Sequence, residues 1–337
     1  MFVAKSDAEL IAAKLRSGDR IRIVTPSSSV KLPFITSDII GLAENRLREL
    51  GLHPSYGKHT DERNFLDSSE IESRVEDLNQ AFANTDISMI QSVIGGFNSG
   101  ELLQHLNYDL IRRNPKVLVG YSDITSLANA IYAKTGLVTY SGPHFFDFGE
   151  KQGFEYTMEY FRKCLFSSDP FDVLPSEKWS NDRWGLAQDQ RTFFPNEGLI
   201  IANKGEAKGR IIGGNLVTLT SINGSPFFPP LKRETVLFLE EDRGEDLYTF
   251  NRNLNSLILR PDFQNVVGIV IGRFEQESGI TTQKLLEVLK YHRELNGIPI
   301  IYGVDFGHTT PKITFPIGGT CRLVADPNKP TLTIIEH

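Results

Sequence analysis

The chain has 337 residues, of which 40% are hydrophobic and 23% charged, a composition typical of a globular protein with enough length for two domains. A formal net charge of −6 argues against a nucleic-acid partner, which would require a basic face. The sequence holds no run of about 18 apolar residues, so we expect no membrane-spanning helix and no membrane partner.

The N-terminal stretch is amphipathic and lacks the basic start and apolar block of a signal peptide. Cys164 and Cys321 lie far apart, so neither a disulfide framework nor a thiolate metal site is expected. We therefore expect a cytoplasmic protein.

Strands and helices alternate through the first half of the chain. We expect strands at 20–25, 87–94 and 116–120, and helices at 38–50, at 69–83 with a capping box from Ser69 to Glu72, from Glu101, and from Ile124. This alternation indicates a parallel, doubly wound sheet, which binds ligands at the carboxyl ends of its strands.

The segment Lys116 to Gly136 changes period around one serine. An apolar run typical of a buried strand ends at Gly120, helical spacing begins at Ile124, and Gly136 is a suitable C-cap. Ser122 thus lies on a tight strand-to-helix turn, the geometry of a nucleophile elbow.

The turn around Ser122 also has a simpler interpretation. Serine and aspartate are both favoured N-caps, so Ser122 or Asp123 could merely cap the helix. In the catalytic interpretation, unpaired backbone N–H groups at the helix start, that of Asp123 among them, stabilise an oxyanion. A nucleophile also needs a base elsewhere in the chain.

The glycine-rich loop Gly95 to Gly100 lacks the spacing of a dinucleotide fingerprint or a P-loop. It could be a tight turn that needs positive φ. Alternatively, Gly96 brings its N–H close to a substrate oxygen as a second oxyanion donor, with Asn98 and Ser99 as polar contacts.

Between 149 and 195 the periodic pattern weakens, apart from a possible helix at 154–166. The stretch 167–196 is rich in Ser, Asp, Pro and aromatic residues, and its length favours a functional loop. Trp179 and Trp184 either pin this loop to the protein body or stack on an aromatic ligand.

The second half predicts a smaller, mixed α/β domain with some antiparallel pairing. We expect strands at 207–212, 234–239, 266–271 and 299–302, a turn at 213–215, helices at 216–222, 246–259 and 281–293, and a hairpin of 321–324 with 331–335.

Two features of this half complement Ser122. The strand at 236–239 runs into the carboxylates Glu240 and Glu241, and His308 lies in a glycine-containing loop after another strand. A serine, a histidine and an acid form a relay in which the imidazole takes the serine proton and the acid fixes its tautomer. His308 could instead be a hydrogen-bonded loop histidine.

A metal site is a weaker interpretation. It would recruit His144 with Asp147, or Asp305 with His308, but neither set gives a dense cluster of three ligands. We expect no metal and no organic cofactor.

Three sets of segments together resemble a known family: GGFNSGELL, VGYSDITSL followed by YSGPHF, and VLFLEED paired with DFGHTTPKITFPIG. They are similar to the serine peptidases that comprise L,D-carboxypeptidases (muramoyl-tetrapeptide carboxypeptidases) and microcin C immunity-type peptidases. The resemblance spans nearly the whole chain, from Pro26 to Gly318.

The resemblance implies a flavodoxin-like N-terminal domain at 1–165, a linker and substrate loop at 166–200, and a swivelling β/β/α domain at 201–337. It further implies a site in the groove between the domains, and a homodimer.

The family's motifs place the nucleophile on Ser122, the histidine on His308 and the acid on the glutamate that closes the LFLE strand. We prefer Glu240, because its distance from the strand start matches and alternation places it opposite Leu239. Glu241 remains an alternative.

The backbone N–H groups of Gly96 and Asp123 would then form the oxyanion hole. The loop around Trp184, with RTFFPNEG at 191–198, resembles the immunity-type branch, where an aromatic side chain can stack on adenine. Further expected polar substrate contacts are Asn98, Asn215 and Arg243.

The serine, histidine and acid together with the resemblance imply a serine peptidase that cleaves an amide bond in a small peptide or a peptide–nucleotide conjugate. The alternative within the family is an L,D-carboxypeptidase that trims D-alanine from a murein tetrapeptide. An alternative of another class is a non-catalytic protein whose two α/β domains close on a small ligand.

Overall fold

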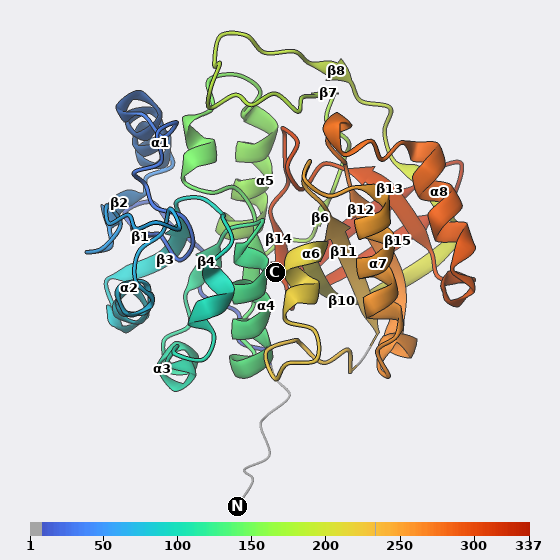
Figure 1. The fold of residues 1–337 in the computed structure, drawn as a ribbon, viewed down its shortest axis with the longest axis horizontal. Coiled ribbons are helices and arrows are strands. Elements are labelled where there is room, and N and C mark those ends of the chain that lie inside the picture. Colours follow the sequence, from blue (N-terminus) through green and yellow to red (C-terminus); the bar gives the residue numbers. More distant parts are fainter. Residues whose placement is uncertain (1–8, 233) are drawn as a thin grey trace, which may run out of the picture.

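The computed structural model describes residues 9–232 and 234–337, so part of the amphipathic N-terminal stretch lies outside the described residues. The N-terminal half forms one open sheet with its helices and the C-terminal half forms a second, with α4 between them (Figure 1). This confirms the predicted α/β class with a parallel sheet.

The first sheet has the strand order β14-β5-β4-β3-β1-β2, and its strands from β5 to β2 are parallel. Its members are β1 (Arg20–Val24), β2 (His53–Tyr56), β3 (Ile87–Ser92), β4 (Val117–Val119), β5 (Thr139–Ser141) and β14 (Phe315–Ile317). β14 comes from the C-terminal half and pairs antiparallel with β5, so the chain returns to the first sheet near its end.

The helices of this half are α1 (Ser37–Glu49), α2 (Ile71–Ala83), α3 (Tyr108–Arg113), α4 (Ile124–Thr135) and α5 (Glu155–Phe166), with 3₁₀ turns η1 (Ser99–Leu102) and η2 (Phe146–Gly149). The predicted capping box is wrong: Glu70 is the N-cap of α2 without a side-chain hydrogen bond, and the Ser69 hydroxyl is buried with no partner among the described residues. The helix expected from Glu101 is only the short turn η1.

The second sheet has the order β6-β16-β15-β10-β11-β12-β13-β9. Its members are β6 (Phe171–Asp172), β9 (Ile200–Asn203), β10 (Gly205–Asn215), β11 (Thr235–Glu240), β12 (Val266–Gly272), β13 (Ile300–Val304), β15 (Thr320–Ala325) and β16 (Thr331–Glu336). The four central strands β10 to β13 are parallel, and the outer strands pair antiparallel. The predicted C-terminal hairpin is β15 with β16.

The turn expected at 213–215 is wrong, because β10 continues to Asn215. Gly213 and Gly214 have φ of 147° and 127°. A Cβ on Gly213 would lie 1.9 Å from the Phe238 carbonyl oxygen, and one on Gly214 would lie 2.5 Å from the Thr125 hydroxyl. The glycines therefore allow β10 to pack closely against β11 and α4.

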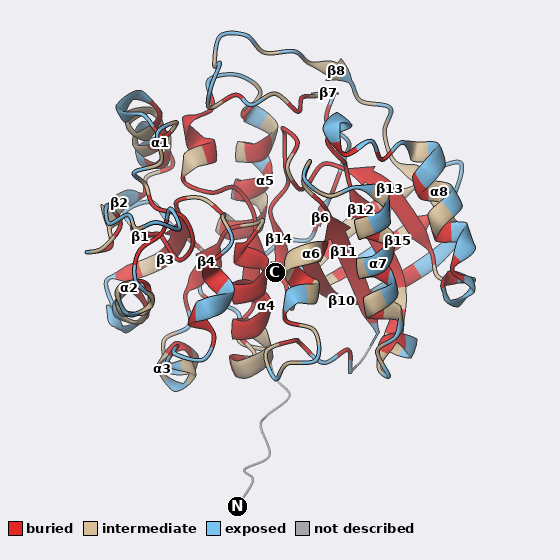
Figure 2. Ribbon diagram, viewed as in Figure 1, coloured by how far each residue is buried: buried red, intermediate tan, exposed pale blue. Residues whose placement is uncertain are grey.

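The remaining elements are α6 (Leu216–Ser221), α7 (Leu247–Ile258), α8 (Thr282–Tyr291), η3 (Phe263–Asn265), η4 (Gln276–Ser278), η5 (Arg293–Leu295) and a small hairpin of β7 (Lys178–Trp179) with β8 (Phe194–Pro195). Figure 2 shows the strands buried and the outer helices exposed on one side. Among the described residues, no helix is both long and apolar enough to span a membrane.

Candidate active site

Ser122 lies on the turn between β4 and α4, as the change of period predicts. Its φ is 57°, a left-handed conformation that non-glycine residues seldom adopt, and such strain is typical of functional sites. Gly136 ends α4 with φ of 77°. The helix-cap alternative is wrong: Asp123 is at the N-cap position without a side-chain capping bond, and the Ser122 hydroxyl faces His308 instead.

The Asp123 carboxylate ties together three loops that follow β1, β3 and β4. It accepts hydrogen bonds from the Ser27 hydroxyl at 2.6 Å and from the Ser99 backbone N–H at 2.8 Å. The Ser99 hydroxyl in turn donates to the Asp123 carbonyl at 2.6 Å. The loops are therefore fixed at one edge of the sheet, where a parallel sheet places its ligands.

The glycine-rich loop approaches the serine closely. A Cβ on Gly95 would lie 3.0 Å from the Ser122 Cβ, so a larger residue there would displace the serine. Gly96 has φ of 149° and packs against Ser27 and Ser28, in agreement with the expected need for positive φ.

Ser122, His308 and Glu240 form one continuous line of hydrogen bonds. The Nε2 of His308 lies 3.0 Å from the Ser122 Oγ, and its Nδ1 lies 2.8 Å from the Glu240 Oε2. Because a carboxylate only accepts, Nδ1 carries a proton, and once Nε2 has lost its own proton it can accept from the serine. This arrangement is typical of serine hydrolases.

Gly307 makes room for the contact between His308 and Glu240. It has φ of 101°, and a Cβ there would lie 2.6 Å from the Glu240 Oε2. The Glu240 side chain is buried, and its Oε1 has no hydrogen-bond partner among the described residues. Among the residues that the structure describes, the imidazole is thus the only hydrogen-bond partner of this carboxylate.

Burial lowers the pKa of His308, but the charge and hydrogen bond of Glu240, with Glu275 and Asp242 nearby, outweigh it and raise this pKa to about 9. In the absence of a ligand, the imidazole is therefore protonated at neutral pH. A histidine that acts as a base from this state gains activity as the pH rises.

Glu241 points away from His308. Its Oε2 accepts from the Val217 backbone N–H at 3.3 Å, and its Oε1 from the Asn253 amide at 3.4 Å. Burial and the neighbouring Glu240 raise its pKa to about 8. The neutral form of Glu241 is therefore favoured at pH 7.

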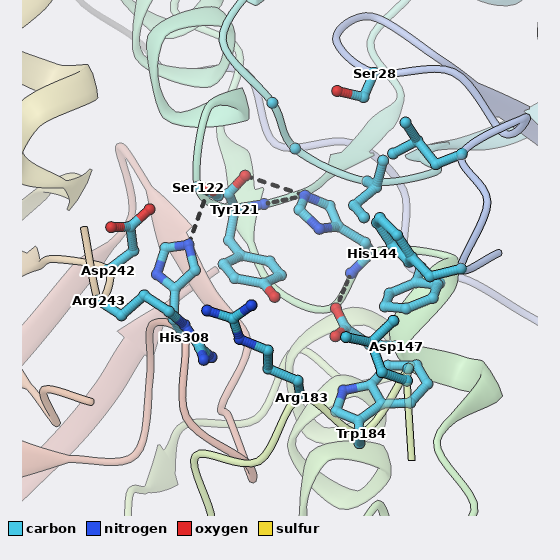
Figure 3. A pocket seen from close by; sticks show the side chains of 18 of the residues that line it. Ser28, Tyr121, Ser122, His144, Asp147, Arg183, Trp184, Asp242, Arg243 and His308 are labelled. Atoms are coloured by element: carbon cyan, nitrogen blue, oxygen red, sulfur yellow. Dashed lines mark hydrogen bonds between the residues drawn. The ribbon is translucent and has the colours of Figure 1, made fainter. Parts of the chain in front are cut away.

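A cavity of about 540 Å³ opens beside the serine (Figure 3). Of the residues predicted from the sequence, it is lined by Gly96, Ser122, Trp184, Arg243 and His308. The cavity is large enough for a small peptide or a nucleotide.

Asn98 and Asn215 do not line the cavity. Asn98 is buried, and its carbonyl accepts from Arg74 at 2.9 Å. The Asn215 Oδ1 caps α6, accepting from the Thr218 backbone N–H at 3.1 Å and its hydroxyl at 2.8 Å. The amide of Asn215 is therefore engaged within the protein.

A second set of residues supports the turn before the serine. The rings of Tyr121 and His144 stack with centroids 4.2 Å apart, and the His144 backbone N–H donates to Asp147 at 2.8 Å. Asp147 also pairs with Lys312 at 3.4 Å. Burial lowers the pKa of His144 to about 4, so its ring is neutral. Sequence reasoning missed these roles, because no local pattern places the Lys312 Nζ over the Tyr121 ring, 5.0 Å from its centroid.

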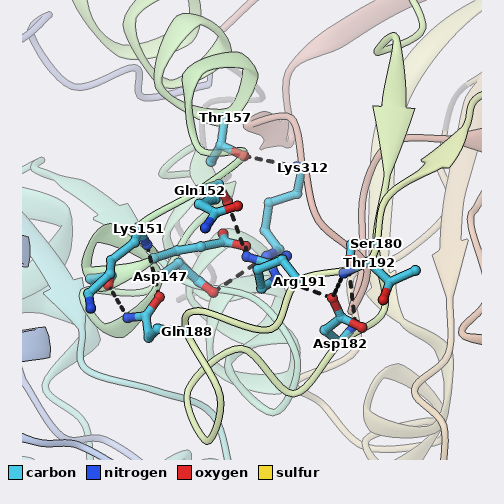
Figure 4. Close-up of polar contacts among 12 residues, drawn as sticks. Asp147, Lys151, Gln152, Thr157, Ser180, Asp182, Gln188, Arg191, Thr192 and Lys312 are labelled. Atoms are coloured by element: carbon cyan, nitrogen blue, oxygen red, sulfur yellow. Dashed lines mark hydrogen bonds and ion pairs between the residues drawn. The ribbon is translucent and has the colours of Figure 1, made fainter.

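The loop between β7 and β8 covers one side of the cavity. Trp184 is buried and stacks on Phe146 with centroids 4.3 Å apart. Arg191, on the same loop, has a fully buried side chain that pairs with Glu150 at 2.6 Å and Asp182 at 3.3 Å (Figure 4).

Trp179 lies in the stem of this loop. It packs against Phe194 with centroids 5.1 Å apart and against the Arg273 guanidinium at 4.9 Å. Trp179 therefore pins the loop, as the structural interpretation proposes, while Trp184 lines the cavity.

The described residues contain no group of three or more His, Cys, Asp or Glu side chains that could hold a metal ion. Asp305, the partner of His308 in one of the two possible metal sets, pairs with Arg273 at 3.3 Å.

Comparison with known proteins identifies the family of this chain. The model of the LD-carboxypeptidase N-terminal domain matches residues 21–142, and that of the LD-carboxypeptidase C-terminal domain matches residues 208–323. The chain belongs to the LD-carboxypeptidase family, peptidase family S66, and is accordingly a hydrolase of the serine carboxypeptidase class.

Similar proteins align with almost the whole chain. The crystal structure of an MccF-like protein from Bacillus anthracis is 46% identical, covers 97% of this chain and 100% of its own, and superposes with a TM-score of 0.95. The Bacillus subtilis protein YocD is also 46% identical, over 97% of this chain and 100% of its own. The microcin C7 self-immunity protein MccF of Escherichia coli is 34% identical, over 97% of this chain and 96% of its own.

Proposed function

We propose that this chain is a serine peptidase that hydrolyses an amide bond in a small peptide or peptide–nucleotide conjugate, with Ser122, His308 and Glu240 as its catalytic triad. One observation carries the proposal: a serine held at positive φ is bonded to an imidazole that is bonded to a buried carboxylate. All of these groups lie at strand ends beside one cavity.

In the proposed reaction, His308 takes the proton of Ser122 while the serine oxygen attacks the amide carbonyl carbon. The oxyanion accepts hydrogen bonds from the backbone N–H groups of Gly96 and Asp123. Collapse of the intermediate breaks the C–N bond, and His308 returns the proton to the leaving nitrogen. Water then attacks the acyl-enzyme, with the same imidazole as base, and releases Ser122.

The microcin immunity-type substrate is our first choice. MccF, a relative at 34% identity, has been solved in complex with aspartyl sulfamoyl adenosine. In this chain the Trp184 ring lines the cavity, and an aromatic face is suited to a nucleobase.

The murein substrate is the second candidate. The chain is 25% identical to the murein tetrapeptide carboxypeptidase of Pseudomonas aeruginosa, over 90% of this chain and 92% of that protein. In that case Trp184 would only support the loop.

A paired hydrolysis assay read by mass spectrometry tests the proposal. The purified protein is offered an L,D-linked murein tetrapeptide and aspartyl sulfamoyl adenosine. Release of aspartate alone supports a detoxifying peptidase, and release of D-alanine alone supports a carboxypeptidase. Hydrolysis that persists in Ser122→Ala would contradict the proposed triad, whereas tight binding without hydrolysis by the unaltered protein would favour the non-catalytic alternative.

A further inference from the structure

Among the described residues, three Lys or Arg side chains line the cavity, and they differ in what faces them. Arg243 pairs with Glu275, and Lys312 pairs with Asp147. The guanidinium of Arg183 has no hydrogen bond or ion pair with any residue that the structure describes. Arg183, an exposed residue, is thus the basic side chain of this cavity that has no partner among the described residues.

The acidic side chains of the cavity are engaged elsewhere. Besides the pairs just named, Asp182 pairs with Arg191 at 3.3 Å, and Asp242 accepts the Gly244 backbone N–H at 2.6 Å. Arg183 therefore remains available to a ligand.

The chain on both sides of Arg183 is anchored. Asp182, which precedes it, is held by the buried Arg191, and Trp184, which follows it, stacks on Phe146. Anchoring of the backbone lowers the entropy that is lost when the guanidinium binds a partner.

The guanidinium extends from the loop into the cavity. In Figure 3 it is drawn between the Trp184 ring and the pair of Ser122 and His308, and all four residues line the same cavity. A substrate with its carbonyl carbon at Ser122 and its far end at Trp184 has its leaving group along this path.

We propose that Arg183 binds the anionic group carried next to the leaving nitrogen of the substrate and so determines specificity, an inference that rests on the proposed function. The two candidate substrates share this chemistry. In a murein tetrapeptide, the leaving D-alanine carries a carboxylate on the carbon bonded to that nitrogen. In an aminoacyl sulfamoyl adenosine, the leaving nitrogen belongs to an acidic acyl sulfamate, whose negative charge is shared with the sulfonyl oxygens bonded next to it. The planar guanidinium fork matches either group with two parallel hydrogen bonds.

The experiment compares each anionic substrate with a neutral counterpart. The tetrapeptide is paired with its C-terminal amide, and aspartyl sulfamoyl adenosine with the aspartyl amide of 5′-amino-5′-deoxyadenosine. The proteins are the unaltered chain, Arg183→Gln, Arg183→Lys, and a control, Arg162→Gln, which changes an exposed arginine on α5 outside the cavity. Steady-state kinetics are combined with calorimetric titration in the Ser122→Ala background.

For the anionic substrate that is turned over, we expect Arg183→Gln to lower kcat/KM by about 10- to 30-fold, mainly through KM, as for loss of a charged hydrogen bond. The neutral counterpart should change by less than about threefold, within the range of ordinary surface substitutions. Arg183→Lys should recover part of the loss, and Arg162→Gln should change nothing. The substrate pair that shows this effect identifies the anion that Arg183 binds, either the D-alanine carboxylate or the sulfamate.

Equal losses on the anionic and neutral partners would overturn the inference, because they would indicate a structural role in the loop. The absence of any loss would overturn it too. If no substrate is hydrolysed, the proposed function fails, but titration still decides about Arg183: weaker binding of only the anionic ligands by the Arg183→Gln variant supports it. An equal effect on the binding of the anionic and the neutral ligands, or no binding of either kind, contradicts the inference about Arg183.

Discussion

The two sides of the cavity are built in different ways. On one side, Ser122, Glu240 and His308 lie at or just after strand ends, and their positions depend on backbone features such as the positive φ of Ser122 and Gly307. On the other side, the loop between β7 and β8 is held by a few side-chain contacts, chiefly those of Arg191 and Trp184. The triad side is suited to catalysis, which tolerates no displacement of the reacting side chains. The loop side is suited to substrate selection, which can vary with the side chains of the loop.

The largest effect is expected from Ser122→Ala. Because loss of the nucleophile removes covalent catalysis, hydrolysis should fall by about 10,000-fold or more. Substrate affinity, measured by titration calorimetry, should change little. A fall in affinity together with an unchanged turnover number would break the distinction between the two sides.

The adjacent glutamates should behave in opposite ways. Glu240→Gln should lower kcat by about 1,000- to 10,000-fold, since an amide at this position favours the wrong imidazole tautomer. Glu241→Gln should change kcat by less than about threefold, because its side chain points to Val217 and Asn253, away from the imidazole. The reverse ranking would assign the orienting role to Glu241.

Glu241 should also affect how the thermal stability of the protein depends on pH. Its pKa is raised to about 8 in the folded protein, so the neutral form is the one that folding favours. The resulting stabilisation is complete below the unfolded value of about 4.5 and is lost as the pH rises through about 8. Glu241→Gln should therefore raise Tm relative to the unaltered protein at pH 8 more than at pH 5. A gain independent of pH would contradict this assignment.

The pH profile tests the imidazole. Because the pKa of His308 is raised to about 9, kcat/KM should increase about tenfold per pH unit through the neutral range and level off above that value. In Glu240→Gln the residual activity should level off at lower pH, since the carboxylate that raises this pKa is gone. An identical profile in both proteins would exclude His308 as the titrating base.

On the loop side, Arg191→Met should raise KM by about tenfold and leave kcat nearly unchanged, since it releases the loop without touching the triad. This variant also leaves Glu150 buried and unpaired, which is destabilising. The double variant Arg191→Met/Glu150→Gln should recover Tm but not KM. Recovery of both would indicate that the pair serves stability alone.

A smaller effect, on affinity alone, is expected from Trp184→Leu, which removes the aromatic face but keeps an apolar side chain. Affinity for the nucleotide conjugate should fall by about five- to tenfold, as for loss of one stacked base, and affinity for the tetrapeptide should not change. Equal effects on both ligands would reduce Trp184 to a support of the loop.

The same contrast explains what the sequence could predict. The change of period around Ser122 reveals the elbow, and strand alternation favours Glu240 over Glu241, because both patterns are local. The strands β2, β5 and β14 are not predicted, since each has only three or four residues; β4 is equally short, but the longer apolar run at 116–120 reveals it.

Residues on the loop side could not be predicted in the same way. The burial of Arg191 against Glu150, 41 positions away, depends on tertiary packing that no local pattern records. The helix predicted from Ser69 begins two residues later, with Glu70 at its N-cap, a shift of the size by which helix boundaries commonly differ. Likewise Gly213 and Gly214 resemble a turn in sequence, but they serve a close approach between strand and helix.

Trapping of the acyl-enzyme tests the central claim most directly. The protein is mixed with the substrate that it hydrolyses, quenched in acid during turnover and measured by intact-protein and peptide mass spectrometry. The account predicts an adduct of the acyl mass on the peptide that contains Ser122, more abundant when Glu240→Gln slows its hydrolysis and absent in Ser122→Ala. Full turnover by Ser122→Ala, or an adduct on another residue, would contradict it.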